Sequence, residues 1–256
     1  MKTFGFRFVI FLIIFFGCAS PDEYVILHQV TGPINTNCYL LYDIKSKEAA
    51  LFDVGGPVDS LLSAITEKNL KVKYIFATHC HMDHLEGVPF IRKLFPGALL
   101  CYNNEDYKDF LVSIDWGIKN FDPKMTEALK NNPETAKWFE YDLSIFGPPD
   151  VNLADGQIYP LGALKIHTIL SPGHSRGSIC YYVGTVLLSG DVLFYRTAGR
   201  TDLLGGSTQE LVGSVRRLYS QCPDETIVYP GHGRPTDIGS EKMNNKKITV
   251  DQVNMK

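Results

Sequence analysis

The sequence lacks an excess of basic residues. Lys and Arg together number 25 against 28 for Asp and Glu, and the formal net charge at pH 7 is −3. Proteins that bind nucleic acids usually carry a positively charged patch or stripe. We therefore expect no nucleic-acid partner, which counts against a phosphodiesterase that acts on RNA.

Cysteine is scarce as well, with six residues in a chain of 256. Apart from Cys18, an odd number at irregular spacing remains, which is no disulfide framework, although one bridge stays possible in an oxidising compartment. Three of these lie in apolar, strand-like runs and are expected to be buried thiols. The five are Cys38, Cys80, Cys101, Cys180 and Cys222, and the buried three are Cys38, Cys101 and Cys180.

The first residues contain an apolar run that is too short to span a membrane. It covers the nine residues 8–16, whereas a helix across a bilayer needs about 20. Lys2 and Arg7 precede the run and Gly17 follows it, an order typical of a secretory signal peptide. We predict a signal peptide at 1–18, a short tether at 19–23 and one folded domain at 24–256, a length that suits a single domain.

Cys18 at the predicted cleavage point resembles the lipobox of bacterial lipoproteins, in which that cysteine is acylated. The resemblance implies an exported protein that is anchored in a membrane through a lipid on Cys18 and faces the periplasm or the cell exterior. Phe15 and Phe16 match the usual lipobox residues poorly. Plain export, an uncleaved anchor and a cytoplasmic location are the alternatives.

Apolar residues make up 45% of the chain and charged residues 21%, which is typical of a folded globular protein. Apolar patterns predict two runs of strands, each accompanied by helices. Strands are predicted at 24–30, 37–42, 49–54, 71–78 and 97–102, and then at 157–159, 164–170, 178–183, 186–188 and 225–229. Helices are predicted from residue 57, at 85–95 and from Ser207 to near Gln221.

The region between the two runs, residues 103–150, loses this regular pattern. It is rich in aromatic residues among many charges, and a Pro148-Pro149 pair closes it. We predict an insertion of short helices. Its aromatics either fill a small satellite core or form a cover over a cleft that shapes a substrate pocket.

The strongest motif is the segment Thr78-His79-Cys80-His81-Met82-Asp83-His84, which follows a predicted strand. Imidazole nitrogen and carboxylate oxygen are ligands that zinc prefers. His79 and His81, two apart on an extended segment, point the same way and can share one metal. Asp83 and His84 stand where a helix begins and can reach a second metal. Cys80 faces the opposite way and is expected to pack behind the site.

Three more candidate ligands each follow a predicted strand and stand beside glycine: His174, Asp191 and His232. Together with the motif they supply seven ligands at strand ends, where open sheets place their sites. His167 alternates with the apolar face of its strand and is expected at the surface. His28 stays unassigned. Asp53, at the end of the third strand, either orients a metal ligand from behind or is an ordinary turn residue.

These motifs resemble the metallo-β-lactamase superfamily and, within it, the glyoxalase II-like hydrolases, over nearly the whole chain from Tyr24 to the Gly239 region. The resemblance implies an α/β fold, namely a four-layer αββα sandwich with the site at one edge of its two sheets. It also implies two divalent metal ions, zinc or alternatively iron or manganese. His79, His81 and His174 would hold one ion, Asp83, His84 and His232 the other, and Asp191 would bridge them.

The implied activity is hydrolysis of a small thioester or ester. Two adjacent ions can hold a shared water and lower its pKa toward neutrality, and they stabilise the oxyanion that forms. Asp83 would accept and return the proton, so that Asp83 and Asp191 are the catalytic candidates. Glyoxalase II enzymes grip glutathione with a C-terminal helical domain, whereas this chain ends 24 residues after His232. A different thioester or ester is therefore equally consistent with the motifs.

Other functions share parts of the pattern. Residues 199–202 resemble a loop of persulfide dioxygenases, which use a single iron held by two His and one Asp; this is the main alternative. Tyr195 stands near Asp191, where some lactonases have a catalytic Tyr. The resemblance counts against a β-lactamase, because one branch of those enzymes has a Cys and the other a non-bridging residue where this chain has Asp191. A non-catalytic, metal-stabilised lipoprotein would be expected to lack some ligands, and this sequence retains all seven. The oligomeric state stays open.

The lipid anchor gives a first testable prediction. Cells that express the full chain should incorporate labelled palmitate into it, and Cys18→Ala should abolish the label because it removes the acylated thiol. Cys222→Ala serves as the control and should leave the label in place. Absence of label from the unaltered chain would leave a protein without this anchor.

Overall fold

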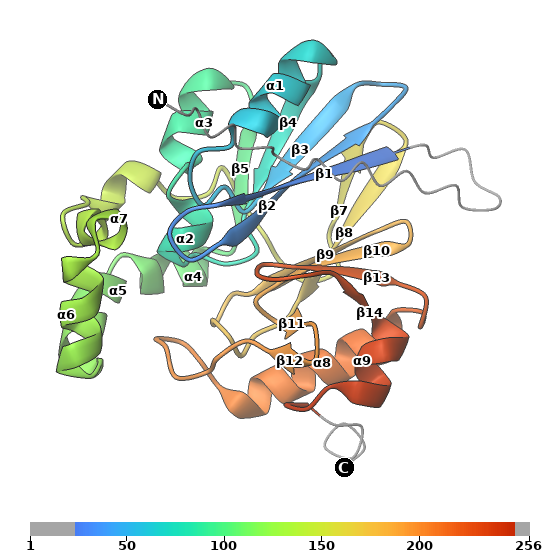
Figure 1. Cartoon of the computed structure of the whole chain (residues 1–256). Coiled ribbons are helices and arrows are strands. Elements are labelled where there is room, and N and C mark those ends of the chain that lie inside the picture. Colours follow the sequence, from blue (N-terminus) through green and yellow to red (C-terminus); the bar gives the residue numbers. More distant parts are fainter. Residues whose placement is uncertain (1–23, 249–256) are drawn as a thin grey trace, which may run out of the picture.

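The computed structural model describes residues 24–248, and two six-stranded sheets form its centre (Figure 1). The predicted signal peptide and tether, and residues 249–256 of the predicted domain, lie outside the described residues. The first sheet contains, in spatial order, β1 (Tyr24–Thr31), β2 (Thr36–Asp43), β3 (Glu48–Phe52), β4 (Lys71–Phe76), β5 (Leu99–Tyr102) and β6 (Val151–Asn152). The second contains β14 (Thr236–Asp237), β13 (Ile227–Pro230), β10 (Val186–Gly190), β9 (Ile179–Val183), β8 (Leu164–Leu170) and β7 (Ile158–Leu161).

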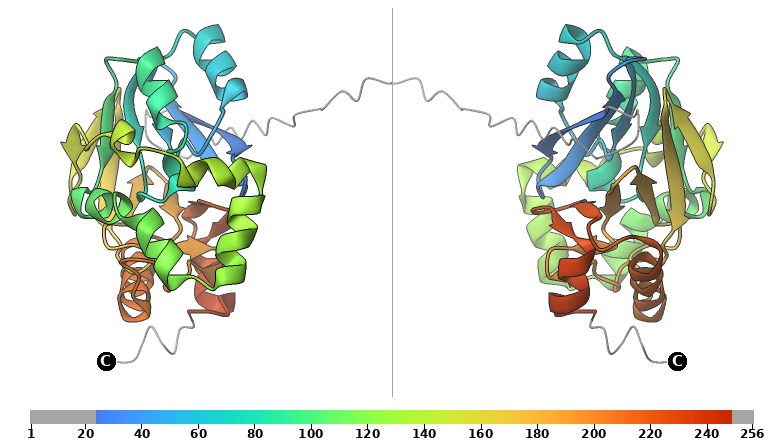
Figure 2. Two further views of the ribbon diagram at one scale, coloured as in Figure 1. Left: turned by 90° about the vertical axis from the view of Figure 1, so that its left-hand side faces the viewer. Right: turned by 90° about the vertical axis from the view of Figure 1, so that its right-hand side faces the viewer.

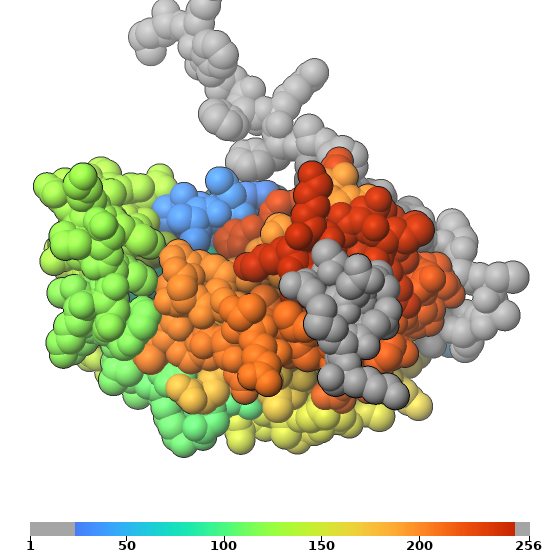
Figure 3. Space-filling view, turned by 90° about the horizontal axis from the view of Figure 1, so that it is seen from below, coloured from blue at the N-terminus to red at the C-terminus, as the bar shows by residue number. Residues whose placement is uncertain are grey.

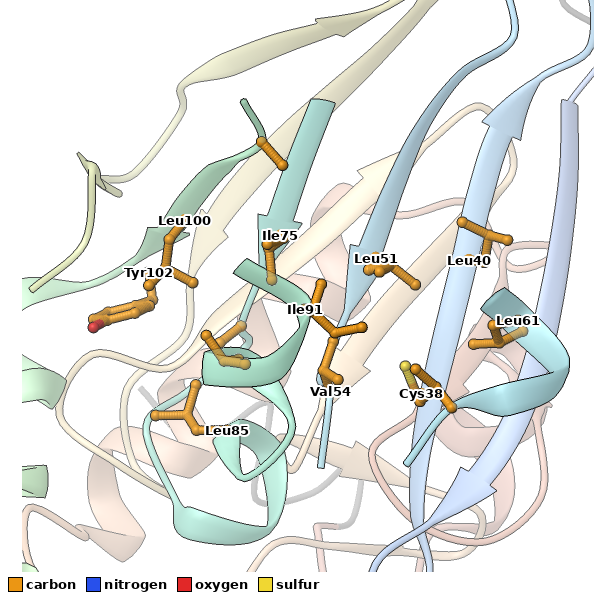
Figure 4. Close-up of a cluster of buried hydrophobic side chains, with 14 of the residues drawn as sticks. Cys38, Leu40, Leu51, Val54, Leu61, Ile75, Leu85, Ile91, Leu100 and Tyr102 are labelled. Atoms are coloured by element: carbon orange, nitrogen blue, oxygen red, sulfur yellow. The ribbon is translucent and has the colours of Figure 1, made fainter. Parts of the chain in front are cut away.

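Helices cover the outer face of each sheet, which confirms the predicted αββα sandwich. On the first sheet these are α1 (Asp59–Glu67) and α3 (Val88–Leu94), and on the second α8 (Thr208–Gln221) and α9 (Ile238–Asn244). Every residue of β2 is buried, because alternate side chains point to the two sides of a sheet that is covered on both. Leu40 packs toward the helices (Figure 4), and its neighbour Leu41 packs toward the second sheet.

The core between the two sheets is rich in aromatic rings. Phe76 on β4 lies 5.1 Å from Phe52 and 4.9 Å from Tyr181 of the second sheet, measured between ring centroids. The Tyr181 hydroxyl donates a hydrogen bond of 2.6 Å to the carbonyl of Ala77, at the end of β4. The second sheet is thereby attached to the strand that leads into the metal-binding motif.

The helix predicted at 85–95 is instead two helices, α2 (Met82–Leu85) and α3. The chain breaks at Gly87, whose backbone N–H donates to the carbonyl of Val54 rather than along a helix. A side chain at Gly87 would also collide with Val54. The helix start was therefore predicted three residues too late, and Asp83 and His84 belong to α2 itself.

The insertion consists of short helices, as predicted: α4 (Asn104–Phe110), α5 (Ser113–Asn120), α6 (Pro123–Asn131), α7 (Pro133–Ala136) and 3₁₀ turns at 137–139 and 143–146. Phe110 and Phe146, near its two ends, are buried in the core between the first sheet and the helices that cover it. Helix α6, in contrast, buries no residue. Figure 1 shows α5 to α7 standing out from one edge of the sandwich, and in the left view of Figure 2 these helices face the viewer. The ends are thus part of the core, and the middle is an overhanging arm.

The five cysteines of the described chain are all free and buried. This confirms the buried thiols at Cys38, Cys101 and Cys180, and no disulfide forms among the described residues. No helix between residues 24 and 248 combines the length and the apolar character needed to cross a membrane.

The aromatic core predicts a large effect on stability. Phe76→Ala should lower the free energy of unfolding by about 3–5 kcal/mol, because it removes a fully buried ring and leaves a cavity between the sheets. Phe90→Ala is the matched control, since that ring is 55% exposed and should contribute little. Urea unfolding of both variants measures the difference, and equal losses would contradict the assigned core.

Candidate metal centre

The seven predicted ligands converge at one edge of the sandwich, from both sheets. His79, His81, Asp83 and His84 follow β4, while His174 follows β8, Asp191 follows β10 and His232 follows β13. Three overlapping groups have donor atoms close enough to hold a metal ion: His79 with His81 and His174, His79 with His84 and Asp191, and Asp83 with His84 and His232. Ends of strands that are far apart in sequence meet here because they share a sheet edge.

Three imidazole nitrogens face one another in the first group. His79 Nε2 lies 3.0 Å from His81 Nδ1 and 3.2 Å from His174 Nε2, and His174 Nε2 lies 3.0 Å from His81 Nδ1. The rings stand nearly perpendicular to one another. Such an arrangement directs three lone pairs to one point, as a tetrahedral metal requires.

The second group joins Asp83 to two imidazoles. Asp83 Oδ2 lies 3.2 Å from His84 Nε2 and 3.3 Å from His232 Nε2. The Thr36 hydroxyl donates a hydrogen bond of 2.9 Å to the same oxygen and fixes the carboxylate. Sequence analysis missed Thr36, because nothing in its local sequence distinguishes it from other strand residues.

Asp191 lies between the two groups. Its Oδ2 is 3.5 Å from both His174 Nε2 and His232 Nε2, and its Oδ1 is 3.5 Å from His84 Nε2. One carboxylate therefore faces ligands of both groups, which is the position required of a bridging ligand.

Backbone carbonyls determine which nitrogen of two ligands carries the proton. His174 Nδ1 lies 2.8 Å from the Arg200 carbonyl, and His232 Nδ1 lies 3.2 Å from the Asn35 carbonyl. A carbonyl only accepts, so Nδ1 must donate, and the lone pair of Nε2 points into the site. Partners of this kind hold metal-binding imidazoles in place.

Asp53 supports two further ligands from behind. Its carboxylate accepts hydrogen bonds from the Thr78 backbone N–H at 2.7 Å and the Thr78 hydroxyl at 2.9 Å. With its proton directed to Asp53, that hydroxyl accepts from His79 Nδ1 at 3.0 Å. Asp53 Oδ2 also lies 3.2 Å from His84 Nδ1. Of the two interpretations of Asp53, the geometry favours the one in which it orients ligands.

Electrostatics keep the first group neutral. Burial, followed by the neighbouring imidazoles, holds the pKa of His79 well below its ordinary value. Burial likewise lowers the pKa of His81 to about 3 and that of His174 to about 4. These three imidazoles have free lone pairs at neutral pH, so little proton competition opposes a cation.

The second group has the opposite balance. Burial alone would lower the pKa of His84, but Asp83, Asp53 and Asp191 raise it well above the ordinary value. Burial would raise the pKa of Asp83, yet the same contact with His84 and that with His232 hold it well below the usual range. For Asp191 burial prevails, and its pKa is raised.

The donor set fits two divalent cations. His84 Nε2 and Asp191 Oδ1 are buried, and neither makes a hydrogen bond to any described residue. A buried polar atom without a partner costs free energy, and a cation placed among these donors would satisfy both. A side chain at Gly231 would come within 2.2 Å of Asp191 Oδ1 and fill this space.

Cys80 packs behind the site as predicted and is buried. Its backbone N–H donates to the buried carboxylate of Asp106, which also accepts from the Ser175 hydroxyl at 2.7 Å and the Gly177 N–H. Asp106 thus joins the loop of His79 and His81 to that of His174. No motif pointed to Asp106, because it lies within the insertion.

The two remaining histidines lie outside the three groups. His28 stacks on Tyr39 and contacts the Asn37 side chain at 2.7 Å, a structural role on β1. His167 is partly exposed on β8, in keeping with the predicted surface position.

Comparison with known proteins agrees with this geometry. Residues 31–232 match the model of the Metallo-beta-lactamase superfamily. Hydroxyacylglutathione hydrolase GloC of Haemophilus influenzae is 31% identical to this chain. The alignment covers 82% of this chain and 91% of the GloC chain. Human persulfide dioxygenase ETHE1 is 27% identical, and the alignment covers 91% of this chain and 79% of the ETHE1 chain.

Two solved structures have the same architecture. BLEG-1 B3 metallo-beta-lactamase is 31% identical, with a TM-score of 0.68. The superposition covers 86% of this chain and 98% of the BLEG-1 chain. TTHA1623 in a di-iron-bound form is 27% identical, with a TM-score of 0.64 over the same shares. The chain belongs to the metallo-β-lactamase superfamily, and the relatives are consistent with its glyoxalase II-like branch.

The donor geometry predicts the metal content. The purified protein should hold about two divalent ions per chain, because its seven donors form two groups that share Asp191. His174→Ala should lower this content, since it removes a donor of the first group, whereas the control His167→Ala should retain it. Elemental analysis after dialysis against zinc measures both variants, and equal contents would contradict the assignment of His174.

Proposed function

We propose that this protein is a dinuclear metal-dependent hydrolase that acts on a thioester or ester. The observation that carries the proposal is the position of Asp191, whose carboxylate faces ligands of both donor groups. His79, His81 and His174 would hold one ion, Asp83, His84 and His232 the other, with Asp191 between them. When bound, such ions supply a water of lowered pKa and polarise the substrate carbonyl.

The protein's own residues orient these groups and handle the proton. Asp83 is ionised, held by the Thr36 hydroxyl, and in this proposal takes the proton of the attacking water. Oxygen from that water adds to the carbonyl carbon, the bond from this carbon to the leaving sulfur or oxygen breaks, and the proton returns to the leaving group. The products are a carboxylic acid and a thiol or alcohol, so one water is consumed for each bond cleaved.

The proposal rests on two kinds of support, the donor set and the relatives. GloC, a hydroxyacylglutathione hydrolase, supports a thioester, and the di-iron form of TTHA1623 supports two ions. Zinc is the proposed metal, with iron or manganese as alternatives. Asp83 and Asp191 are the proposed catalytic residues.

A single-iron persulfide dioxygenase is the second candidate, favoured by the likeness to human ETHE1. Residues 199–202 resemble a loop of persulfide dioxygenases, and the Arg200 carbonyl accepts a hydrogen bond from His174. The convergence of all seven donors favours two ions over one. Oxygen consumption with a persulfide substrate, at one iron per chain, would establish this second function in place of the first.

Export and lipid anchoring complete the proposal. The order of residues 2–18 supports a signal peptide and an acylated Cys18, so that the enzyme would act on the outer side of the cell membrane. A small-molecule substrate of the periplasm or the cell exterior follows from this location.

Activity should respond differently to two aspartates. Asp53→Ala should lower kcat/KM for a thioester about 10–100-fold, because it removes the carboxylate that orients His84 and, through Thr78, His79. Asp191→Ala should lower it further, because it removes the donor shared by both groups. Hydrolysis of S-lactoylglutathione, a simpler thioester, a lactone and a β-lactam measures both, and equal losses would contradict the bridging role.

A further inference from the structure

A pocket opens directly beside the metal centre. It has a cavity volume of about 170 Å³, and His81 and Asp83 form part of its wall. This volume is smaller than that of a whole small-molecule site, about 300–1,000 Å³, so the pocket suits one group of a substrate rather than a complete molecule. Whatever occupies the pocket therefore lies next to the bond that the proposed function would break.

The rest of the wall is almost entirely apolar. The insertion contributes aromatic and aliphatic side chains, among them Ile114, Trp116, Leu129 and Trp138, and the loop after β12 (Thr197–Ala198) contributes Leu203 and Leu204. In Figure 3 the yellow-green helices of the insertion border the orange segment around residue 200. Two segments that are far apart in sequence thus enclose one hydrophobic space.

The pocket wall, within the described chain, contains no Lys or Arg. Nearby cations already have partners: Arg200 pairs with Asp202 through two hydrogen bonds of 2.7 Å, and Lys137 pairs with Glu86. The carboxylates of glutathione would find no opposite charge from Lys or Arg on this wall, and their burial would be costly. A hydrocarbon group would instead gain from burial there.

Glu86 attaches the pocket wall to the metal-binding loop. Its side chain is nearly buried, and its carboxylate accepts a hydrogen bond of 2.6 Å from Trp138 Nε1 in addition to the contact with Lys137. Glu86 follows His84 by two residues, so Trp138 has a defined position relative to the second donor group. The wall is thus placed before a substrate arrives, which reduces the entropy lost on binding.

We propose that this pocket receives a hydrocarbon group of several carbons attached beside the reacting carbonyl, so that the substrate is an apolar thioester or ester rather than a glutathione thioester. This inference rests on the proposed hydrolase function and specifies its substrate class. The hydrocarbon belongs either to the acyl group or to the leaving thiol, and substrates varied on each side separate these two sources.

The binding test uses a signal that does not depend on activity. The chain contains two Trp, Trp116 and Trp138, and both line the pocket. Titration of the metal-loaded protein with straight-chain carboxylates from acetate to octanoate should change tryptophan fluorescence. The affinity should rise about fourfold per added methylene until the pocket is filled. Equal affinity along the series would overturn the proposal.

A matched pair of variants locates the binding. Leu129→Glu places a charge in the pocket wall and should weaken octanoate at least about tenfold, while Ile118→Glu, on an exposed position of α5 outside this wall, should not. Thermal unfolding of both variants checks that they remain folded. Equal affinities in the two variants would contradict the assigned pocket.

The kinetic test separates this inference from the function beneath it. If the pocket receives the acyl group, kcat/KM should increase from acetyl to octanoyl thioesters of the same thiol. If it receives the leaving group, kcat/KM for acetyl thioesters should increase with the length of the alkyl thiol. Turnover that is independent of both lengths, or a preference for S-lactoylglutathione, would overturn the apolar substrate while leaving the hydrolase intact. Length-dependent fluorescence without hydrolysis of any substrate would support the pocket and overturn the hydrolase.

Discussion

The Asp53 carboxylate is the contact on which the metal centre depends. It ends β3 with a positive φ of 55°, a conformation that costs a non-glycine residue free energy, and from there it reaches Thr78 and His84. Through the Thr78 hydroxyl it also orients His79. One buried carboxylate directly after β3 therefore positions a ligand of each donor group, and the strain at its backbone is offset by the hydrogen bonds it accepts.

Further contacts hold the ligand-bearing loops at the same edge of the sandwich. Five imidazoles and two carboxylates converge here, and such a site needs ligands held in place by the residues behind them. Tyr181 joins the second sheet to the end of β4, Asp106 joins the loops of His79 and His174, and backbone carbonyls hold His174 and His232. These contacts position the loops that carry the ligands, and two of them orient the imidazoles of His174 and His232 directly.

Much of the site was predictable, because its ligands follow strands and stand in short, distinctive motifs. The helical packing behind the ligands was not: α2 begins at Met82, three residues before the predicted start, and the break at Gly87 depends on a contact with Val54, which follows β3 and is remote in sequence. Thr36 and Asp106 were missed for the same reason, because their roles arise from neighbours remote in sequence. The two runs of strands and the helix from Ser207 followed from local sequence patterns, and the layered sandwich followed from the family resemblance. The pocket required the tertiary arrangement of the insertion.

Reactivity and substrate choice therefore reside in different parts of the chain. The donors lie on the edges of two sheets, where their positions are determined by the core, while the pocket wall is built from an arm whose middle helix buries no residue. An arm of this kind can change its side chains without disturbing the sheets, since few core contacts depend on it. Glu86 is the point where the two parts meet: it is close to His84 in the chain and hydrogen-bonded to Trp138 in space. A change there would alter the placement of the substrate relative to the reacting centre, and so would affect selectivity before it affected the fold.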